Sequence, residues 1–228
     1  MAIIEVQNIY KIYKEGEIVV NAVNGIDLSF EQGEFTAIVG PSGSGKTTLL
    51  NLIGGLDKAT EGKIIVDGTE INRLSSNKLI DFRLNNIGFI FQAYNLIPVL
   101  TAKENVEFIM NLQGISKSQR EKRTLELLKS VGLEERINSR PNKLSGGQQQ
   151  RVAVARALAS KPKFILADEP TANLDSVSAQ TLLEIMEKLN KDENITFIFS
   201  THDSRVVQKA RRIITIQDGK VISDEKQH

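Results

Sequence analysis

The residues best suited to chemistry in this sequence form a glycine-rich loop, Gly40, Pro41, Ser42, Gly43, Ser44, Gly45, Lys46, Thr47 and Thr48. They match the phosphate-binding pattern G-x-x-x-x-G-K-[ST] in full. An apolar run at 35–39 predicts a buried strand before the loop, and apolar spacing from 48 to 53 predicts a helix directly after it. The loop N–H groups and the positive end of the helix dipole would then converge on an anion.

Two side chains of this loop indicate which anion it would bind. Lys46 would bridge the β- and γ-phosphates of a nucleoside triphosphate, and the Thr47 hydroxyl would bind Mg²⁺. The glycines would let the backbone close around a phosphate without a side chain in the way. A loop that merely turns the chain is the alternative, which the strand before it and the helix after it disfavour.

Two later apolar runs also end in polar groups. Residues 164–167 lead into Asp168 and Glu169, and residues 195–199 lead toward His202. Ligands of open α/β sheets bind at such carboxyl ends of strands. Asp168 would orient Mg²⁺ through its water shell, and Glu169 would polarise the attacking water. An Asp-Glu pair is often a solvated turn and a lone histidine is often structural, but the phosphate loop favours a catalytic pair with His202 at the γ-phosphate.

A second helix N-terminus is predicted where a Ser-Gly-Gly turn precedes a helix over 149–158. Such a terminus is a candidate for a second anion site, although an ordinary capped helix would have the same sequence pattern. The pentapeptide Leu144-Ser145-Gly146-Gly147-Gln148 resembles the signature motif of ATP-binding cassette (ABC) ATPases. It stands between the phosphate loop and Asp168, which is the order found in that family.

The resemblance extends over nearly the whole chain. Gln92 resembles the Q-loop glutamine, Asn173-Leu174-Asp175 resembles the D-loop, and His202 resembles the switch histidine. Tyr13 is similar to the aromatic residue that stacks on adenine, with Tyr10 as the other candidate. The resemblance implies ATP and Mg²⁺ as ligands. It implies Lys46, Gln92, Glu169 and His202 as catalytic residues, and Thr47, Gln92 and Asp168 as the metal site.

The same resemblance implies a head-to-tail homodimer that encloses two ATP molecules. Each ATP would contact Tyr13 and residues 40–48 of one chain. In trans it would contact Ser145, Gly146, Gly147, Gln148 and Asp175 of the other chain. One chain has two helix-terminal anion sites but one lysine-bearing loop, which independently favours a phosphate shared between copies. Dimer closure, transmitted through Gln92 and a helical subdomain, would drive an integral membrane permease.

The resemblance is most specific in three stretches, which are similar to the lipoprotein-release and macrolide-export branch (LolD/MacB-like): residues 54–62, 95–107 and 168–175. The chain has Phe108-Ile109-Met110 where this branch often has a proline, and Ala172 where it often has a glycine. Both departures lie off the catalytic positions. Two alternatives stay open: a soluble ABC ATPase, for example in cluster assembly, and a regulatory ATPase whose membrane partner signals without moving cargo.

Composition limits the remaining function classes. The 228 residues include 29 Lys plus Arg and 28 Asp plus Glu, for a net charge of +1, so a nucleic-acid partner is not indicated. The absence of cysteine excludes disulfides and thiolate sites. No apolar run approaches the ~18 residues that span a bilayer, and residues 1–5 do not form a secretory signal. We therefore expect a peripheral protein on the cytoplasmic side of the inner or plasma membrane.

These residues must be positioned by the predicted strands and helices, which together indicate an α/β fold. The resemblance further implies a RecA-like P-loop core with an N-terminal antiparallel β layer and an inserted α-helical subdomain. We expect one domain over 1–228, with the core and β layer at about 1–90 and 160–228 and the helical subdomain at about 91–159. Capping boxes at Thr101–Glu104 and Ser118–Glu121 predict two helix starts within the mostly helical stretch 74–160. The expected strands lie at 3–7, 19–30 with a break near Asn24-Gly25, 35–39, 63–66, 164–167, 195–199, 213–216 and 221–222.

Overall fold

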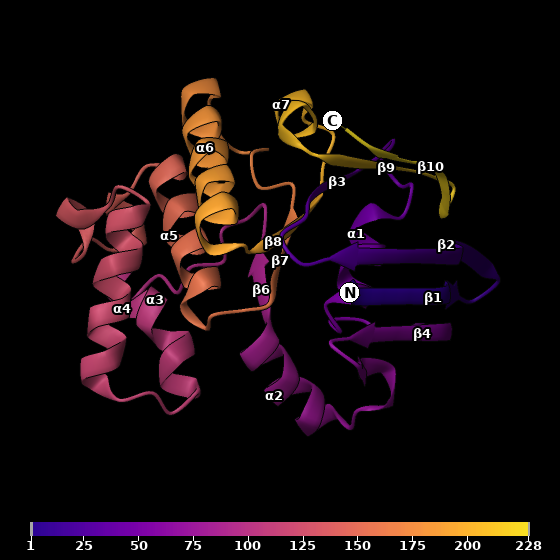
Figure 1. Ribbon diagram of the computed structural model, residues 1–228, viewed down its shortest axis with the longest axis horizontal. Helices are drawn as coiled ribbons and strands as arrows, with labels where there is room; N and C mark the ends of the chain where they lie inside the picture. The colour runs from indigo at the N-terminus through magenta and orange to yellow at the C-terminus, as the bar shows by residue number, and fades with distance from the viewer. Residues whose placement is uncertain (1, 228) are drawn as a thin grey trace.

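The computed structural model describes residues 2–227 and contains two β-sheets, one antiparallel and one mostly parallel (Figure 1). The antiparallel layer has the order β2 (Ile18–Glu31), β1 (Ala2–Glu15), β4 (Glu61–Val66), β5 (Thr69–Glu70). The larger sheet has the order β10 (Lys220–Lys226), β9 (Arg212–Gln217), β3 (Phe35–Val39), β8 (Thr196–Ser200), β7 (Phe164–Asp168), β6 (Ile87–Ile90). Its neighbouring strands are parallel except for β10, which is antiparallel to β9.

Seven α-helices accompany these strands in residues 2–227: α1 (Lys46–Ile53), α2 (Ser76–Asn86), α3 (Ala102–Leu112), α4 (Lys117–Ser130), α5 (Gly146–Ala159), α6 (Ser176–Glu193) and α7 (Ser204–Lys209). Figure 1 shows α3, α4, α5 and α6 on one side of the parallel strands and the antiparallel layer on the other. Short 3₁₀ helices lie at Ile71–Arg73, Glu134–Arg136 and Pro141–Lys143. Within the described residues, no helix is both long enough and apolar enough to cross a membrane.

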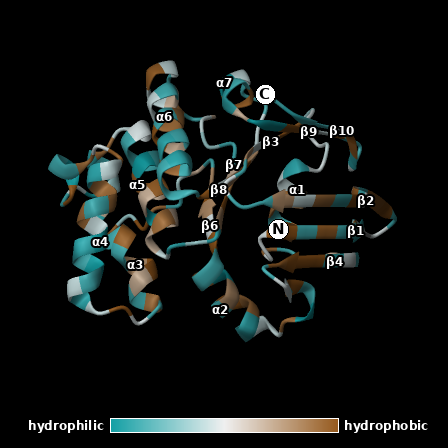
Figure 2. Cartoon of the chain, in the orientation of Figure 1, coloured by the Kyte–Doolittle hydropathy of each residue, from teal (hydrophilic) through white to brown (hydrophobic). Residues whose placement is uncertain are grey.

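The parallel sheet separates two hydrophobic cores. Because successive side chains of a strand point to opposite faces, Ile165 and Ala167 of β7 join the core with α3–α6, whereas Phe164 and Leu166 join the core with α1 and the antiparallel layer. All four residues are buried, as expected for parallel strands covered on both faces. Figure 2 shows the antiparallel strands alternating between hydrophobic and hydrophilic residues, which fits a sheet covered on one face. Thus α1 and α5 pack on opposite faces of one sheet.

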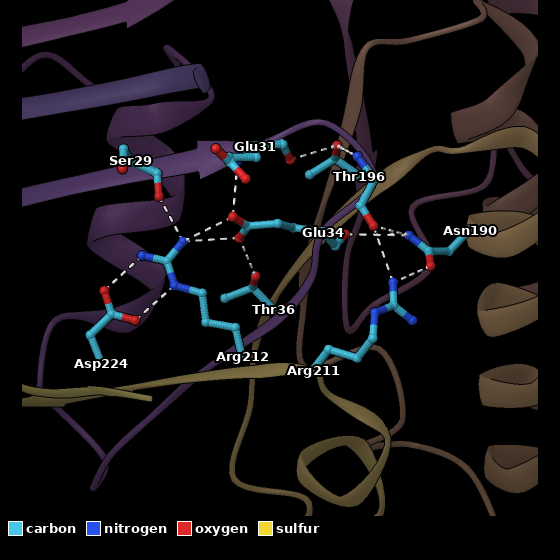
Figure 3. Close-up of polar contacts among 10 residues, drawn as sticks. Ser29, Glu31, Glu34, Thr36, Asn190, Thr196, Arg211, Arg212 and Asp224 are labelled. Atoms are coloured by element: carbon cyan, nitrogen blue, oxygen red, sulfur yellow. Dashed lines mark hydrogen bonds and ion pairs between the residues drawn. The ribbon is translucent and has the colours of Figure 1, made fainter. Parts of the chain in front are cut away.

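An arginine of β9 fastens the antiparallel layer to the parallel sheet (Figure 3). The Arg212 guanidinium donates to the Ser29 carbonyl oxygen at 2.6 Å, to the Glu34 carboxylate at 2.9 Å and to both Asp224 oxygens at 2.7 Å. These hydrogen bonds raise the pKa of Arg212 and lower that of Asp224. Breaking one partner of such a buried cluster is costly, so the junction between the two layers is expected to be stiff.

The structure confirms most expected elements and corrects three. No strand end occurs at Asn24-Gly25; Tyr10 pairs with Asn24 and Ile9 pairs with Ile26, so Gly25 is the extra residue of a bulge within β2. The helix expected to start at Ser118 begins at Lys117 after Ser116, so the Ser118 capping box is wrong, whereas the Thr101 box is present. The stretch expected to be mostly helical also contains strand β6.

Candidate functional site

The phosphate loop connects the carboxyl end of β3 to α1, and its backbone depends on glycine at two positions. Gly40 has φ 151° and Gly45 has φ 101°, values that side-chain-bearing residues rarely adopt. A Cβ on Gly40 would lie 2.0 Å from the Ile216 carbonyl oxygen, and one on Gly45 would lie 2.2 Å from the Ala22 carbonyl oxygen. The backbone of Ile216 and that of Ala22 therefore leave room only for glycine at these two positions of the loop.

The interior of the loop presents hydrogen-bonding groups that a phosphate could use. Lys46 is buried, and its Nζ donates to the carbonyl oxygens of Gly40 and Pro41, each at 2.9 Å. The buried Ser44 hydroxyl has no partner in the described chain. Gly45, the N-cap of α1, provides no side-chain cap, so the first amides of this helix are available to an anion.

Strand β7 brings Asp168 to the phosphate loop. The Thr47 hydroxyl donates to Asp168 Oδ1 at 2.9 Å, although 121 residues separate them in sequence. Hydroxyl and carboxylate oxygens are the ligands that Mg²⁺ prefers, and protein sites of Mg²⁺ commonly supply only one or two of them beside substrate phosphates. Residues 2–227 contain no group of three His, Cys, Asp or Glu side chains that could hold a metal by themselves. This pair therefore fits a magnesium ion shared with a phosphate.

Glu169 and His202 lie together at the ends of β7 and β8. The two atoms Glu169 Oε1 and His202 Nδ1 are 2.7 Å apart, and the Thr201 hydroxyl donates to Glu169 Oε2 at 3.2 Å. The Glu169 side chain is 16% exposed, whereas that of His202 is 75% exposed. Glu169 has φ 45°, a conformation that is costly for a glutamate, and its N–H donates to the Ser200 carbonyl oxygen at 2.8 Å. Such local strain is typical of functional sites.

Tyr13 lies near the end of β1, beside residues that follow α1. Its hydroxyl donates to Asp57 Oδ2 at 2.7 Å, and Lys11 Nζ lies 4.7 Å from the ring centre. Burial and the Asp57 carboxylate raise the pKa of Tyr13. Tyr13 is 42% exposed, whereas Tyr10 is half-buried with its hydroxyl facing Gly25. The accessible ring favours Tyr13 over Tyr10 as the stacking residue.

The Ser-Gly-Gly turn forms the N-terminus of α5 and is already capped. Ser145 Oγ accepts a hydrogen bond from the Gln148 N–H at 3.3 Å, and Gln148 Oε1 accepts one from the Ser145 N–H at 2.9 Å. Gly147 is buried, and a Cβ there would lie 2.7 Å from Ser178 Oγ of α6. A Cβ on Gly146 would lie 2.8 Å from the Tyr94 hydroxyl. Asp175 caps α6, accepting from the N–H groups of Val177 and Ser178 at 3.0 and 2.9 Å.

Gln92 lies after β6, at the junction with the helices. Its side chain is exposed and makes no hydrogen bond within residues 2–227, while its carbonyl oxygen accepts from Asn173 Nδ2 at 3.0 Å. The structure thus brings Lys46, Thr47, Asp168, Glu169 and His202 to one edge of the sheet. No hydrogen bond joins this group to residues 145–148 within the described chain.

Sequence reasoning missed several residues that hold these groups in place: Lys11, Asp57, Gln150 and Arg156. Asp57 was seen only as part of a family-like stretch, and its hydrogen bond to Tyr13 spans 44 residues. Gln150 and Arg156 lie in the helix predicted over 149–158 and carried no role of their own there, yet both hydrogen-bond to the loop that contains Gln92. The one available signal was Gln150 itself, a polar residue among the otherwise apolar or glycine positions that α5 buries.

Comparison with known proteins agrees with this fold and site. Residues 23–172 match the profile of the ABC transporter family. The chain is 49% identical to the ABC transporter ATP-binding protein MJ0796 of Methanocaldococcus jannaschii, over 98% of this chain and 97% of that protein. A dimeric structure of MJ0796 in a post-hydrolysis state, bound to ADP and Pi, has a TM-score of 0.91 at 46% identity and covers 99% of both chains.

A further relative is the macrolide export ATP-binding/permease protein MacB of Mannheimia succiniciproducens, which is 48% identical over 100% of this chain but only 35% of MacB. The fold and site define an α/β ATPase with an antiparallel layer and a helical subdomain. The chain belongs to the ABC transporter family, as an ATP-binding subunit that hydrolyses ATP to ADP and phosphate. Its similarity to MJ0796 and MacB confirms the expected branch.

Proposed function

We propose that two copies of this chain bind two Mg-ATP molecules between them and that hydrolysis drives a separate integral membrane permease. The observation that carries the proposal is the separation of the two helix N-termini. Lys46 begins α1 and Ser145 caps α5, and these helices pack on opposite faces of the sheet. A head-to-tail dimer lets both reach one phosphate, as two copies of each site then face each other. The dimeric structure of MJ0796 supports this arrangement.

Within one copy, residues 40–48 would hold the phosphates and the exposed face of Tyr13 would stack on adenine. Lys46 Nζ would exchange its two carbonyl partners for phosphate oxygens. Thr47, Asp168 and Gln92 would hold Mg²⁺, with Asp168 acting through water. When bound, the ion neutralises charge that develops on the β- and γ-phosphates. The partner copy would add Ser145, Gly146, Gly147, Gln148 and Asp175.

Glu169 is the proposed general base. As a water oxygen forms a bond to the γ-phosphorus, the Glu169 carboxylate accepts a proton from that water. The bond between the γ-phosphorus and the bridging oxygen breaks, and ADP leaves with that oxygen. The 2.7 Å contact to His202 Nδ1 supports a role for His202 in orienting the Glu169 carboxylate and in contacting the γ-phosphate.

An apolar cleft supports a membrane permease as the partner. It has a volume of about 460 Å³ and is lined by residues of α2, β6, α3 and α5. Leu56 and Phe108, which line it, are 43% and 39% exposed, and exposed apolar surface of this kind commonly marks an interaction site. Phe91 and Asn95 also line it, so a docked segment would contact the loop that contains Gln92. This would place the chain on the cytoplasmic face of the membrane.

The proposed cargo class is that of lipoprotein-release or macrolide and peptide export systems, from the similarity to MacB. The test is affinity capture of tagged Glu169→Gln with ATP from detergent-solubilised membranes. We expect turnover to fall by roughly 10² to 10⁴, because the base is removed while the phosphate contacts remain. A permease with few spans and a large extracytoplasmic domain should be recovered. The matched control is Lys46→Ala, whose recovery of the permease should not increase when ATP is added.

Three other outcomes would change the account. A permease with many spans would assign the chain to a different transporter branch. Recovery of soluble partners alone would favour an ABC ATPase of cluster assembly or another soluble process. Recovery of a membrane protein without any transport activity would favour the regulatory alternative. Turnover of Glu169→Gln near the unmodified rate would remove Glu169 from its catalytic role.

A further inference from the structure

Side chains from outside the loop that contains Gln92 hydrogen-bond to the backbone of that loop. Four of its carbonyl oxygens accept hydrogen bonds from side chains of three other residues. Gln150 donates to Phe91, Asn173 donates to Gln92, and Arg156 donates to both Tyr94 and Asn95. Two of these donors belong to α5, the helix that Ser145 caps. The position of the Gln92 side chain therefore depends on α5.

The loop needs this support because its backbone is strained. Tyr94 and Asn95 have φ values of 57° and 50°, which cost free energy for residues other than glycine. Arg156 bonds the carbonyl groups of these same two residues, with a distance of 2.8 Å to the Tyr94 oxygen. A charged donor at two adjacent carbonyl groups offsets the strain and keeps the loop in one conformation.

Gln150 differs from Arg156 because it also hydrogen-bonds to the backbone that follows β7. It is fully buried, and its Nε2 donates to the Pro170 carbonyl oxygen at 2.8 Å as well as to the Phe91 carbonyl oxygen at 3.3 Å. Both partners are acceptors, so the amide nitrogen must face them. Pro170 directly follows Glu169, and Phe91 directly precedes Gln92. One buried amide thus joins the backbone beside the proposed base to the backbone beside the proposed metal ligand.

We propose that Gln150 is a positioning residue that sets the Gln92 loop relative to Glu169. This inference rests on the roles given to Glu169 and Gln92 under the proposed function. Gln150 contacts neither ATP nor water in the reaction. Its loss leaves the buried Pro170 carbonyl oxygen without a donor and leaves the Phe91 carbonyl oxygen with the Tyr94 N–H alone, so the loop and the strand end can then separate.

The test is Gln150→Met, which keeps the length and volume of the side chain but removes the donor. We expect kcat to fall by roughly 10- to 100-fold, because misplacement by about 1 Å can cost that much, while ATP affinity of the single chain changes less than about twofold. The matched control is Gln149→Met on the same helix. Gln149 Nε2 bonds the Leu144 carbonyl oxygen within its own segment, at 3.1 Å, so this variant should keep kcat within about twofold.

A double-mutant cycle with Gln92→Ala separates positioning from simple stability. If Gln150 acts through the Gln92 loop, Gln150→Met should lower kcat much less on the Gln92→Ala background than it does alone. Equal losses on both backgrounds would overturn the proposal, as would a Gln150→Met enzyme with unchanged kcat. If Gln150→Met does not fold, Gln150→Asn, whose shorter amide cannot reach both carbonyl groups, should show the same non-additivity. Failure of the proposed function would appear differently, as undiminished turnover of Glu169→Gln.

Discussion

The N-termini of α1 and α5 are both glycine-flanked anion sites by sequence, yet they are built differently. The start of α1 has Gly45 as its N-cap and no capping side chain, and Lys46 folds into the loop. The start of α5 has a complete capping box between Ser145 and Gln148. The first terminus leaves its amides available to a ligand, whereas the second satisfies part of its amides internally.

This difference indicates an order of binding. A phosphate can enter the open terminus of α1 in a single chain without breaking any cap. At α5, the Gln148 N–H is already bonded to Ser145 Oγ, so only the Ser145 hydroxyl hydrogen and the glycine amides of the turn can donate to a γ-phosphate. We therefore expect the phosphate loop to provide nucleotide affinity and the Ser145 turn to provide dimer closure and turnover. Lys46→Ala changes the first of these termini alone, and Gly147→Ala and Ser145→Ala change the second alone.

The largest effect is expected for Lys46→Ala. Removing a buried ammonium group that would pair with two phosphates should raise the Kd for ATP by roughly 100-fold or more in the single chain. Isothermal titration of the nucleotide measures this directly. Lys58→Ala, which changes an exposed lysine beyond α1, is the control and should leave the Kd unchanged. Tight ATP binding by Lys46→Ala would contradict the role given to α1.

Gly147→Ala should distinguish the contribution of the α5 terminus from that of the α1 terminus. The added Cβ would lie 2.7 Å from Ser178 Oγ and 2.8 Å from Ser178 Cβ, so the start of α5 must move away from α6. We expect turnover to fall by roughly 10- to 100-fold with unchanged ATP affinity of the single chain. Adding Ser178→Gly removes both contacts, and should restore much of the turnover. Ser178→Gly alone, which also loses the hydrogen bond from Ser178 Oγ to Asp175 Oδ2, is the reference. If Gly147→Ala lowers turnover on this background as much as it does alone, Gly147 is required for contact with the partner copy rather than for packing on α6.

A smaller effect is expected for Ser145→Ala. Loss of the N-cap should lower the free energy of unfolding by about 1 kcal/mol. Loss of the hydroxyl at the phosphate should also lower turnover by roughly tenfold, since one hydrogen bond donor to the transition state is removed. Chemical denaturation and steady-state kinetics measure the two effects. Thr101→Ala, which removes the matching cap of α3, should reproduce the loss of stability but leave turnover nearly unchanged.

A change at a third helix terminus, that of α7, is expected to affect the stability of the fold alone. Hydrogen bonds from Arg205 and Thr171 lower the pKa of Asp203, its N-cap, to about 2. Because the folded pKa lies below the unfolded value of about 4, this carboxylate stabilises the fold above pH 4 and loses that contribution between pH 4 and pH 2. Asp203→Asn should remove about 1–2 kcal/mol at pH 7 and flatten this part of the stability profile. An unchanged profile, measured by denaturation at each pH, would exclude this contribution.

The sequence was sufficient to predict the phosphate loop, because residues 40–48 match its motif in full. It was also sufficient to predict β3, β7 and β8, because each is a short apolar run that ends at or near functional residues. The helix start predicted at Ser118 was wrong, because Gln119 follows Ser116 at the same spacing as Glu121 follows Ser118, and spacing alone does not distinguish the two. Strand β6 has only four residues and follows α2 without a break. Its identity is determined by pairing with β7, which is not local information.

Contacts between distant segments were also beyond sequence reasoning. Arg156 bonds the Tyr94 carbonyl oxygen across 62 residues, and Thr47 bonds Asp168 across 121 residues. The second contact was anticipated because both residues were predicted to bind one Mg²⁺. The first has no motif, and an arginine in a helix is usually solvated.

The most direct test of a phosphate shared between copies is mixing of two inactive chains. Lys46→Ala lacks the phosphate loop lysine, and Ser145→Arg blocks the turn at α5; each alone should release little phosphate. In an equal mixture about half of the dimers are mixed, and each mixed dimer has one intact composite site, so phosphate release should recover to about a quarter of the unmodified rate. A mixture that releases no more phosphate than the average of the two separate variants would contradict the shared site.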